Sequence, residues 1–493
     1  MAGLKGIGSA RDYLIMTTTR RFIQIALAAL LPATPLPAQS AAAPALVLTG
    51  ATLIDGTDRP PRANATVVVR NGWITAVGDQ FTVPVPRGAK VVDLRGKYLL
   101  PGFIDMHAHL AIAPWVIDSS GGKRELRFPY DEAATREVTR SQLAFGITAA
   151  RNPAGPTNES VSLRNRQRIG ELEGPRLFTA GWPLDRVAMA DRGVAVATPE
   201  AARAEVRRQA VAGVDYIKLY AGLGPAEVRA GIDEAHRLGI RAIGHLWQTS
   251  WTDAAVAGID GIVHIAPGAA ALLPAASREE YTKGVHGSQF MFDWFKYVDF
   301  DGPEIKAMLD ALTAGRVTID PTLVAFEMIA RSNDSMYAHE SRAWTPPSLA
   351  GQLSGERLLT LGWTPADFTS AQEQFHRMLA FTKRLHDAGV VLTAGTDAAN
   401  PWFFPRELEL FVEAGISSAE VLRIATRNGA MSLGMISEFG TVEPGKRADL
   451  VVLGADPIAD IRNTRRVEWV VQGGHLAPAA SFRPERLRTP PYH

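Results

Sequence analysis

The sequence predicts an α/β protein, in which a (β/α)8 (TIM) barrel carries a small β-sandwich formed from both ends of the chain. Two patterns predict this architecture. Through the middle of the chain, eight short apolar segments alternate with helix-like segments, as parallel strands and their crossover helices do. Before and after this region lie short strand patterns bounded by Gly, Pro, Asn and Asp.

The composition sets limits on the kinds of site that the chain can form. With 493 residues and 46% hydrophobic content, it can bury a large core. Its 52 basic and 51 acidic residues give a net charge of +1, so nothing predicts binding to nucleic acid. The chain has no cysteine, which removes disulfides, thiolate ligands and cysteine nucleophiles. Any metal must therefore be held by histidine, carboxylate or a modified side chain.

Residues 1–42 are predicted to be a bacterial signal peptide. Arg20 and Arg21 precede a short apolar run over residues 23–31, and small residues and prolines follow it, which is the order of an export signal. The run is shorter than the ~20 residues that span a bilayer as a helix. We expect cleavage near Ala38 or Ala42, a periplasmic location and no stable membrane anchor. The arginine pair is compatible with twin-arginine export; the alternative to a signal peptide is a buried N-terminal helix.

Both flanks of the middle region are predicted to build the composite β-sandwich, from residues 43–98 and 436–480. The first flank contains apolar strand segments and, at residues 70–73, the sequence RNGW, whose Asn-Gly is typical of a tight hairpin. The second flank repeats the strand pattern within residues 440–474. Because a β region of about fifty residues is marginal alone, we expect the two flanks to fold together. Residues 481–493 are expected to form a tail.

The inserted segment, residues 99–435, is the predicted barrel. Helix-like runs such as residues 198–213 and 224–239 separate most of its strand-like pieces. The eight predicted strands cover residues 103–105, 146–151, 176–181, 214–220, 240–245, 261–265, 316–321 and 390–397. In such a barrel the chemistry lies at the carboxyl ends of the strands.

Residues that can bind metal end several of these predicted strands. The segment PGFIDMHAHL places His107 and His109 one residue apart, so on extended backbone both rings point to the same side, as two ligands of one ion must. Four more candidates end later strands: Lys218, His245, His264 and Asp397. Singly, each has an ordinary structural explanation, such as a hydrogen-bonded histidine or, for the aspartate, a helix N-cap. Six candidates in phase with the barrel favour one metal site.

With these features the chain resembles the amidohydrolase superfamily, from about residue 45 to 475. The resemblance rests on the split β region, the PGFIDMHAHL segment, the lysine-bearing strand, the two later histidines, the strand ending in GTD, and GTVEPGKRADLVVL at residues 440–453. More narrowly, the chain resembles imidazolonepropionase-like proteins and metal-dependent Xaa-Pro dipeptidases of the binuclear branch. Several of these carry a lysine in a segment like DYIKLYAG, residues 215–222 here.

The resemblance implies two divalent metal ions. His107, His109 and Asp397 would bind the more buried ion, and His245 and His264 the second. Lys218 would bridge the ions as a carbamate, because a desolvated lysine has a depressed pKa and its neutral amine can add carbon dioxide. The alternative is an uncarboxylated lysine that pairs with a substrate carboxylate above a single metal. Imidazole and oxygen ligands favour zinc, and manganese or cobalt would fit nearly as well.

A two-metal site of this kind implies hydrolysis of a carbon–nitrogen acyl bond by a metal-bridging hydroxide. Asp397 would take the proton of the hydroxide and pass it to the leaving nitrogen. Tyr220 would either hydrogen-bond the oxyanion of the tetrahedral intermediate or simply pack. The expected substrate is an N-acyl amino acid, a dipeptide or an aromatic amide. The alternatives are a carbamate, ester or lactone hydrolase and, in another class, a non-enzymatic binding protein with a decayed site.

Substrate recognition is predicted from residues near the barrel mouth. Two segments depart from the pattern of related dipeptidases, TAARNPAGP at residues 148–156 and AGWPLDRVAMADRG at residues 180–193. The candidates to clamp a substrate carboxylate are Arg151, Arg186 and Arg192. The candidates for an aromatic pocket, or for loop packing, are Trp115, Trp182 and Trp247. The aromatic segment at residues 289–300 would form a lid, a contact between two copies of the chain, or a helix packed on the barrel.

Overall fold

The computed structural model describes residues 44–488 except residues 80, 115, 119–124, 188–192, 285–286, 335–339, 350–356 and 358. The predicted signal peptide, Trp115, Arg192 and the end of the predicted tail lie outside the described residues. No helix within the described part is long and apolar enough to cross a membrane. The described residues belong to one compact unit, so the predicted domain boundaries inside it stay predictions.

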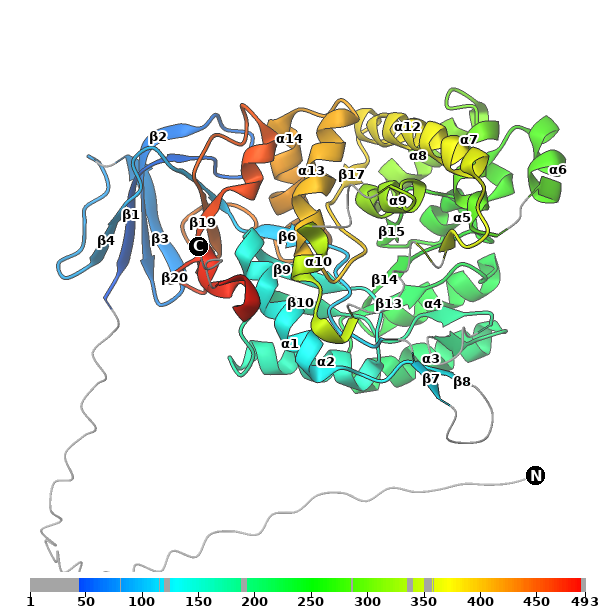
Figure 1. Ribbon diagram of the computed structural model, residues 1–493, viewed down its shortest axis with the longest axis horizontal. Coiled ribbons are helices and arrows are strands. Elements are labelled where there is room, and N and C mark those ends of the chain that lie inside the picture. Colours follow the sequence, from blue (N-terminus) through cyan, green and yellow to red (C-terminus); the bar gives the residue numbers. More distant parts are fainter. Residues whose placement is uncertain are drawn as a thin grey trace, which may run out of the picture. The chain divides into compact units, whose positions relative to one another are not determined.

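Strands from both ends of the chain share one eight-stranded sheet, which contains the dark blue and the red strands of Figure 1. These strands are β1 (Leu46–Leu53), β2 (Arg62–Arg70), β3 (Trp73–Asp79), β4 (Lys90–Asp93), β5 (Tyr98–Pro101), β18 (Leu450–Leu453), β19 (Val467–Gln472) and β20 (His475–Pro478). Their order is β20-β19-β18-β5-β1-β2-β3, with β4 beside β1. The antiparallel pairing of β5 with β18 joins the two ends of the chain.

The composite sheet has a hydrophobic core to which both ends contribute. Leu48 and Val67 from the first end lie in one buried cluster with Val452 from the second. The β2–β3 hairpin turns at Asn71 and Gly72, whose φ angles are 49° and 81°, as the Asn-Gly pair predicts. The predicted composite β region is therefore present, and its strands belong to one hydrogen-bonded sheet.

Each of the eight predicted barrel segments contains a parallel strand. These strands are β6 (Phe103–Asp105), β9 (Ile147–Asn152), β10 (Arg176–Thr179), β13 (Tyr216–Leu219), β14 (Arg241–Gly244), β15 (Gly261–Val263), β16 (Thr318–Asp320) and β17 (Val391–Leu392). They form two parallel ladders, β10-β9-β6 and β13-β14-β15-β16-β17. The short strands β11 (Leu184–Asp185) and β12 (Val194–Ala195) extend the second ladder beyond β13.

Isolated bridges, and not continuous pairing, join the two ladders among the described residues. Ala108 bridges Ala398 just beyond β6 and β17. Ala180, just beyond β10, bridges Tyr216 at the start of β13. The mixed α/β architecture is thus confirmed, whereas a single closed ladder is not detected in the part of the chain that the structure describes.

Helices alternate with the parallel strands and begin and end close to the residues that the sequence indicates (Figure 1). Helix α3, for example, begins after Thr198, whose side chain accepts the N–H of Ala201, and ends at Gly213 with a φ of 93°. The helices are α1 (Glu132–Ser141), α2 (Thr157–Arg168), α3 (Pro199–Ala212), α4 (Pro225–Arg237), α5 (Trp251–Val256), α6 (Ala275–Gly284), α7 (Phe290–Tyr297), α8 (Pro303–Ala314), α9 (Leu323–Ala330), α10 (Glu340–Trp344), α12 (Pro365–Asp387), α13 (Phe404–Glu413), α14 (Ser418–Arg423) and α15 (Gly429–Ser432).

The aromatic segment at residues 289–300 forms helix α7, which packs against α12. Its buried side chains include Phe292, Trp294 and Phe295. Of the three interpretations of this segment, the structure shows the packed helix. A separate antiparallel pair, β7 (Val116–Asp118) and β8 (Glu125–Arg127), follows the first barrel strand.

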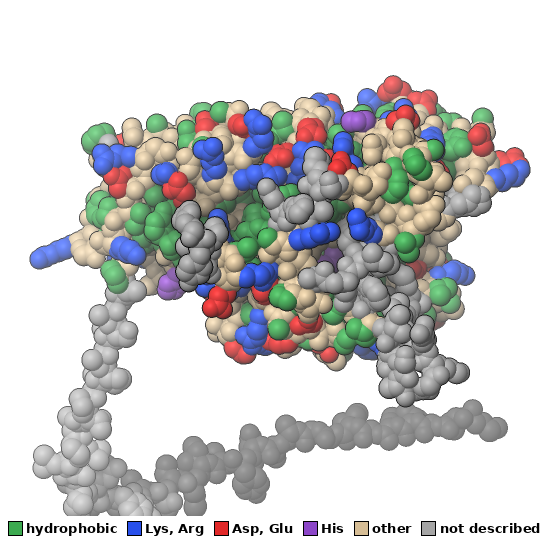
Figure 2. Space-filling model, viewed as in Figure 1, with side chains coloured by type: hydrophobic (Ala, Val, Ile, Leu, Met, Phe, Trp, Pro, Cys, Tyr) green, Lys and Arg blue, Asp and Glu red, His purple; other side chains and the backbone are tan. Residues whose placement is uncertain are grey.

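The surface in view carries charges of both signs. Figure 2 shows Lys and Arg side chains interspersed with Asp and Glu side chains, as the nearly equal counts of basic and acidic residues predict. Many charged side chains at the surface are paired, for example Lys97 with Glu468 and Arg140 with Glu173. Such exposed or partly exposed pairs each contribute about 0–1 kcal/mol, so the stability of the fold depends mainly on its buried apolar core.

The side chain of Phe381 on α12 tests this dependence. It is fully buried, and its ring contacts those of Trp251, Trp294 and Phe295. We expect Phe381→Ala to lower the free energy of unfolding by about 3–5 kcal/mol, because it leaves a cavity among these rings. Phe81→Ala is the matched control, since that ring is 87% exposed and its removal should change stability by less than about 0.5 kcal/mol. Equal effects in urea unfolding would contradict the packing described here.

Candidate metal centre

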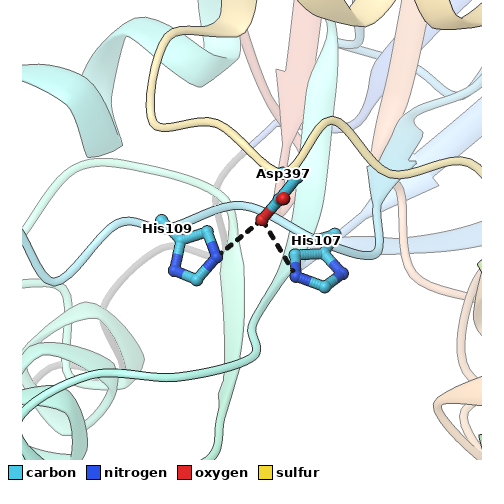
Figure 3. Close-up of side chains that lie close together, drawn as sticks. All are labelled: His107, His109 and Asp397. Carbon is cyan, nitrogen blue, oxygen red and sulfur yellow. Dashed lines mark hydrogen bonds and ion pairs between the residues drawn. The ribbon is translucent and has the colours of Figure 1, made fainter. Parts of the chain in front are cut away.

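Three side chains from opposite ends of the barrel sequence meet at the carboxyl ends of β6 and β17 (Figure 3). His107, His109 and Asp397 each offer one ligand atom, and these atoms all lie within 4.8 Å of one another. Asp397 Oδ1 is 2.9 Å from His109 Nε2 and 3.3 Å from His107 Nε2. Two imidazole nitrogens and a carboxylate oxygen that converge in this way fit a divalent cation.

A buried carboxylate fixes the two backbone segments that carry these ligands. Asp105, at the end of β6, accepts the N–H of His107 at 2.9 Å and the hydroxyl of Thr396 at 2.8 Å. Burial raises the pKa of Asp105 to about 6. Asp397 follows Thr396 directly and has a φ of 54°, a conformation that non-glycine residues seldom adopt. The site therefore depends on a local backbone conformation that the hydrogen bonds of Asp105 stabilise.

His245 and His264 extend the cluster that His107, His109 and Asp397 form. The ring centroid of His264 is 4.7 Å from that of His107 and 4.3 Å from that of His245. His264 Nδ1 is also 3.8 Å from Asp397 Oδ2. The four predicted imidazole ligands and the predicted carboxylate thus form one continuous group, although they come from four different strands.

The nitrogens of the later histidines suit a second cation. His245 Nδ1 is buried and has no hydrogen-bond partner among the described residues, which is unfavourable unless the atom binds a ligand. Burial lowers the pKa of His245 to about 3, and it lowers the pKa of His264 well below its usual value. Both rings are therefore neutral at physiological pH, with one ring nitrogen able to coordinate.

Lys218 on β13 is buried in the same region, with 2% of its surface exposed. Burial, together with the guanidinium of Arg151, lowers the pKa of Lys218 to about 7, against the opposing effects of the Asp397 and Asp320 carboxylates. A substantial fraction of the amine is consequently neutral near pH 7. This is the state from which a carbamate can form.

Aromatic rings line the group beside His245. The centroid of the His245 ring is 4.8 Å from that of Tyr220 and 4.6 Å from that of Trp247. Trp247 in turn contacts Phe290 of α7 at 4.2 Å, edge to face. Trp182 is half-buried after β10, and its backbone N–H donates to Thr157 Oγ1. The structure thus places the rings of Tyr220 and Trp247 beside His245, while a substrate contact of Trp182 stays a prediction.

The two described arginine candidates lie in different environments. Arg151 is 1% exposed, and it donates to the carbonyl oxygen of Met106 at 2.7 Å and to Asp320 Oδ2 at 3.3 Å. This position corrects the expectation of a substrate clamp at Arg151, because the buried guanidinium already has protein partners. Arg186 is exposed and lies 3.4 Å from Glu227. Arg186 also lines a surface pocket of about 390 Å³ together with Asp185, Val187, Gly222, Gly224 and Gln248.

Sequence reasoning missed two polar residues at the end of β16. Asp320 Oδ2 lies 3.2 Å from His107 Nδ1, and Thr322 Oγ1 lies 2.8 Å from His264 Nδ1. The sequence contained a signal for them, since the predicted seventh strand also ends in polar residues, in TIDPT at residues 318–322. Neither residue stood out, because Asp and Thr next to proline are ordinary at the end of a strand.

Comparisons with known proteins agree with this fold. The model of the Amidohydrolase family matches residues 303–476. Over 80% of its length, the chain is 23% identical to an N-substituted formamide deformylase of Arthrobacter pascens, covering 90% of that protein. It is also 23% identical to an imidazolonepropionase of Agrobacterium fabrum, over 81% of this chain and 86% of the other. A putative prolidase from Bifidobacterium longum superimposes with a TM-score of 0.65 and 25% identity, over 88% of this chain and 95% of the other.

The parallel α/β core and the cluster of imidazole and carboxylate groups at its strand ends define a hydrolase of the kind that uses divalent metals. The chain is similar to proteins of the amidohydrolase superfamily, among them imidazolonepropionases and prolidase-like proteins. The resemblance inferred from the sequence motifs is thereby confirmed.

Removal of one ligand tests the centre directly. We expect His109→Ala to lose one metal ion per chain and to abolish turnover, with little change in stability, because the half-buried His109 ring contributes to the site more than to the core. Metal content by mass spectrometry and thermal unfolding are the measurements. His376→Ala serves as the control, since His376 is an exposed histidine on α12. Unchanged metal content in His109→Ala would show that this histidine is structural.

Proposed function

We propose that the protein is a metal-dependent hydrolase of amide bonds, acting on an N-acyl amino acid, a dipeptide or an aromatic amide. The observation that carries the proposal is the convergence of His107, His109 and Asp397 with two further neutral imidazoles at one end of the parallel strands. The relatives support the same type of reaction, since they include an N-substituted formamide deformylase and an N-acyl-D-aspartate deacylase.

We also propose that the eight parallel strands act as one closed barrel. The bridges from Ala108 to Ala398 and from Ala180 to Tyr216 lie at the two junctions between the ladders, where closure requires contact. A closed barrel explains why side chains from β6, β13, β14, β15 and β17 reach a common centre, because all strand carboxyl ends then face the same side.

The donor groups divide into two sets. His107, His109 and Asp397 would hold one divalent ion, and His245 and His264 would hold a second. When bound, such ions supply Lewis acidity and lower the pKa of a bound water toward ~7. Zinc suits imidazole and carboxylate donors, and manganese or cobalt also fit.

Lys218 is proposed to complete the centre as a carbamate. The ammonium group would first lose one proton; the neutral amine nitrogen would then form a bond to the carbon of carbon dioxide and release a second proton to solvent, which turns a cationic side chain into an anionic one. The lowered pKa of the buried amine supports this step, since the amine must be neutral to react. The anionic carbamate would then be a ligand shared by the two cations that the two sets of donors would hold.

The remaining steps belong to side chains of the chain itself. The Asp397 carboxylate would accept a proton from the attacking water and return it to the leaving nitrogen, which regenerates the carboxylate. Tyr220, beside His245, would donate a hydrogen bond to the developing oxyanion. Trp247 and Phe290 would cover the site and contact an apolar or aromatic substituent. Arg186 would pair with a substrate carboxylate at the neighbouring pocket.

Export to the periplasm is a separate proposal. It rests on the basic pair Arg20 and Arg21 and the apolar run over residues 23–31. Fractionation of cells that express the full chain would test it. Protein that stays in the cytoplasm at full length would contradict it.

The bridging role of Lys218 has a specific test. We expect Lys218→Ala to lose most of the second metal ion and to lower kcat/KM by more than about tenfold (~1.4 kcal/mol). Addition of a small carboxylic acid should restore part of both, because it supplies the missing anionic bridge. Lys283→Ala, at an exposed lysine on α6, is the control. Full activity and full metal content in Lys218→Ala would rule out the bridge.

The reaction class is tested with a mixed panel of N-acyl amino acids, dipeptides and aryl amides. We expect release of amine from some of these by protein reconstituted with zinc, manganese or cobalt, and none from Asp397→Asn. Selective cleavage of substrates with a free carboxylate would support Arg186 as their partner. Protein that holds two metal ions and cleaves esters, carbamates or lactones, but no amide of the panel, would show that its reaction is hydrolysis of one of those other substrates.

A further inference from the structure

The end of β16 touches two of the predicted ligand rings without supplying a ligand itself. Asp320 Oδ2 lies 3.2 Å from Nδ1 of His107, which follows β6. Thr322 Oγ1 lies 2.8 Å from Nδ1 of His264, which follows β15. Both contacts therefore involve Nδ1, which leaves Nε2 of each ring as the nitrogen free to coordinate. His107 Nε2 indeed faces Asp397 at 3.3 Å.

The carboxylate of Asp320 is held in place from two further directions. It is 2% exposed, and the same Oδ2 atom accepts from the guanidinium of Arg151 at 3.3 Å. On the other side lies Gly395, where a Cβ would clash with the Asp320 carboxylate and with the Cβ of His107. The absent side chain at Gly395 thus makes room for the contact between Asp320 and His107.

Thr322 is held in an unusual backbone conformation. Its φ is 51°, which is rare for a β-branched residue and stores strain. It is the N-cap residue of α9, where a threonine side chain usually accepts a hydrogen bond from the first turn of the helix. Here the side chain makes no such bond. Its hydroxyl is instead hydrogen-bonded to Nδ1 of His264.

A carboxylate from another helix replaces the missing cap. Glu407 of α13 is fully buried, and its two oxygens accept the N–H groups of Leu323 at 3.1 Å and of Val324 at 2.7 Å. These are the first two residues of α9. Because Glu407 satisfies the start of the helix, the hydroxyl of Thr322 is available to the histidine.

We infer that the end of β16 is the orienting element of the metal centre: Asp320 and Thr322 are positioning residues that hold Nδ1 of His107 and of His264, and Glu407 makes this possible by capping α9 in place of Thr322. The inference rests on the proposed function, since it requires bound metal. A ligand histidine normally donates its second ring N–H to a partner of this kind, and loss of that partner weakens metal binding or activity about 10–100-fold.

The main test compares Thr322→Val with Thr322→Ser in the full-length protein, stripped of metal and titrated with zinc against a chromophoric chelator. Thr322→Val keeps the branched shape and removes only the hydroxyl. It should raise one of the two dissociation constants about 10–100-fold and alter the absorption spectrum of the cobalt form. Thr322→Ser should restore both the wild-type dissociation constant and the wild-type cobalt spectrum. Thr382→Val is the matched control, because Thr382 is equally buried and its hydroxyl donates to the carbonyl oxygen of Met378 within α12.

Two further variants separate the parts of the inference. Glu407→Gln should weaken binding of the same ion as Thr322→Val does, because Glu407 is inferred to act through Thr322. The double variant Arg151→Met/Asp320→Leu removes both buried charges together. It should weaken binding of the other ion, for which His107 is the proposed ligand. Thermal unfolding of the metal-free proteins shows whether each variant is folded. If the double variant is unfolded, the comparison of Thr322→Val with Thr322→Ser tests the inference.

The outcomes distinguish this inference from the function on which it rests. Wild-type zinc affinities and an unchanged cobalt spectrum in folded Thr322→Val would overturn the orienting role. A wild-type protein that binds no divalent ion at all would overturn the proposed function as well. Weakened binding in Thr382→Val to the same degree as in Thr322→Val would show a general effect of stability and would also overturn the inference.

Discussion

The hydrogen bonds of one buried carboxylate hold together the two chain segments on which the candidate metal centre depends. Asp105 binds the N–H of His107 and the hydroxyl of Thr396, a residue 291 positions away in the sequence. These contacts place the first histidine pair beside Asp397. A buried carboxylate is costly without partners, so its bonds also define a single arrangement of the two segments. The remaining ligands join a group whose position is already fixed.

Burial gives the other groups of the site their chemical state. The same desolvation that lowers the pKa of His245 and His264 keeps these rings neutral, and it lowers the pKa of Lys218 toward neutrality. A metal ligand has to be in its uncharged or anionic form. The apolar interior of the strand core therefore prepares the donors for cations before any cation is present. Among the described residues the buried Nδ1 atom of His245 has no hydrogen-bond partner, which is the state expected of a nitrogen that binds a ligand.

Similarity to the amidohydrolase superfamily does not identify a substrate, because one fold can serve many reactions. Specificity is expected from residues around the mouth of the site. In this chain the proposed ones are Trp247 and Phe290, whose rings contact each other, and Arg186, which lines a surface pocket. Arg151 belongs to a different group, since its charge is used inside the protein to hold Asp320.

The sequence by itself determined the local elements and the identities of the principal candidates. Hydrophobic periodicity located the eight strands, the Asn-Gly pair determined the hairpin between β2 and β3, and the strand-end positions singled out His107, His109, Lys218, His245, His264 and Asp397. Only the tertiary structure decided the second layer of contacts. The partners of those contacts lie far apart in the chain, as Asp320 does from His107 by 213 residues and Glu407 from Val324 by 83. It also decided that Arg151 is buried. Spacing along a chain reports which side of a strand a residue occupies, whereas hydrogen bonds between strands depend on how the strands pack.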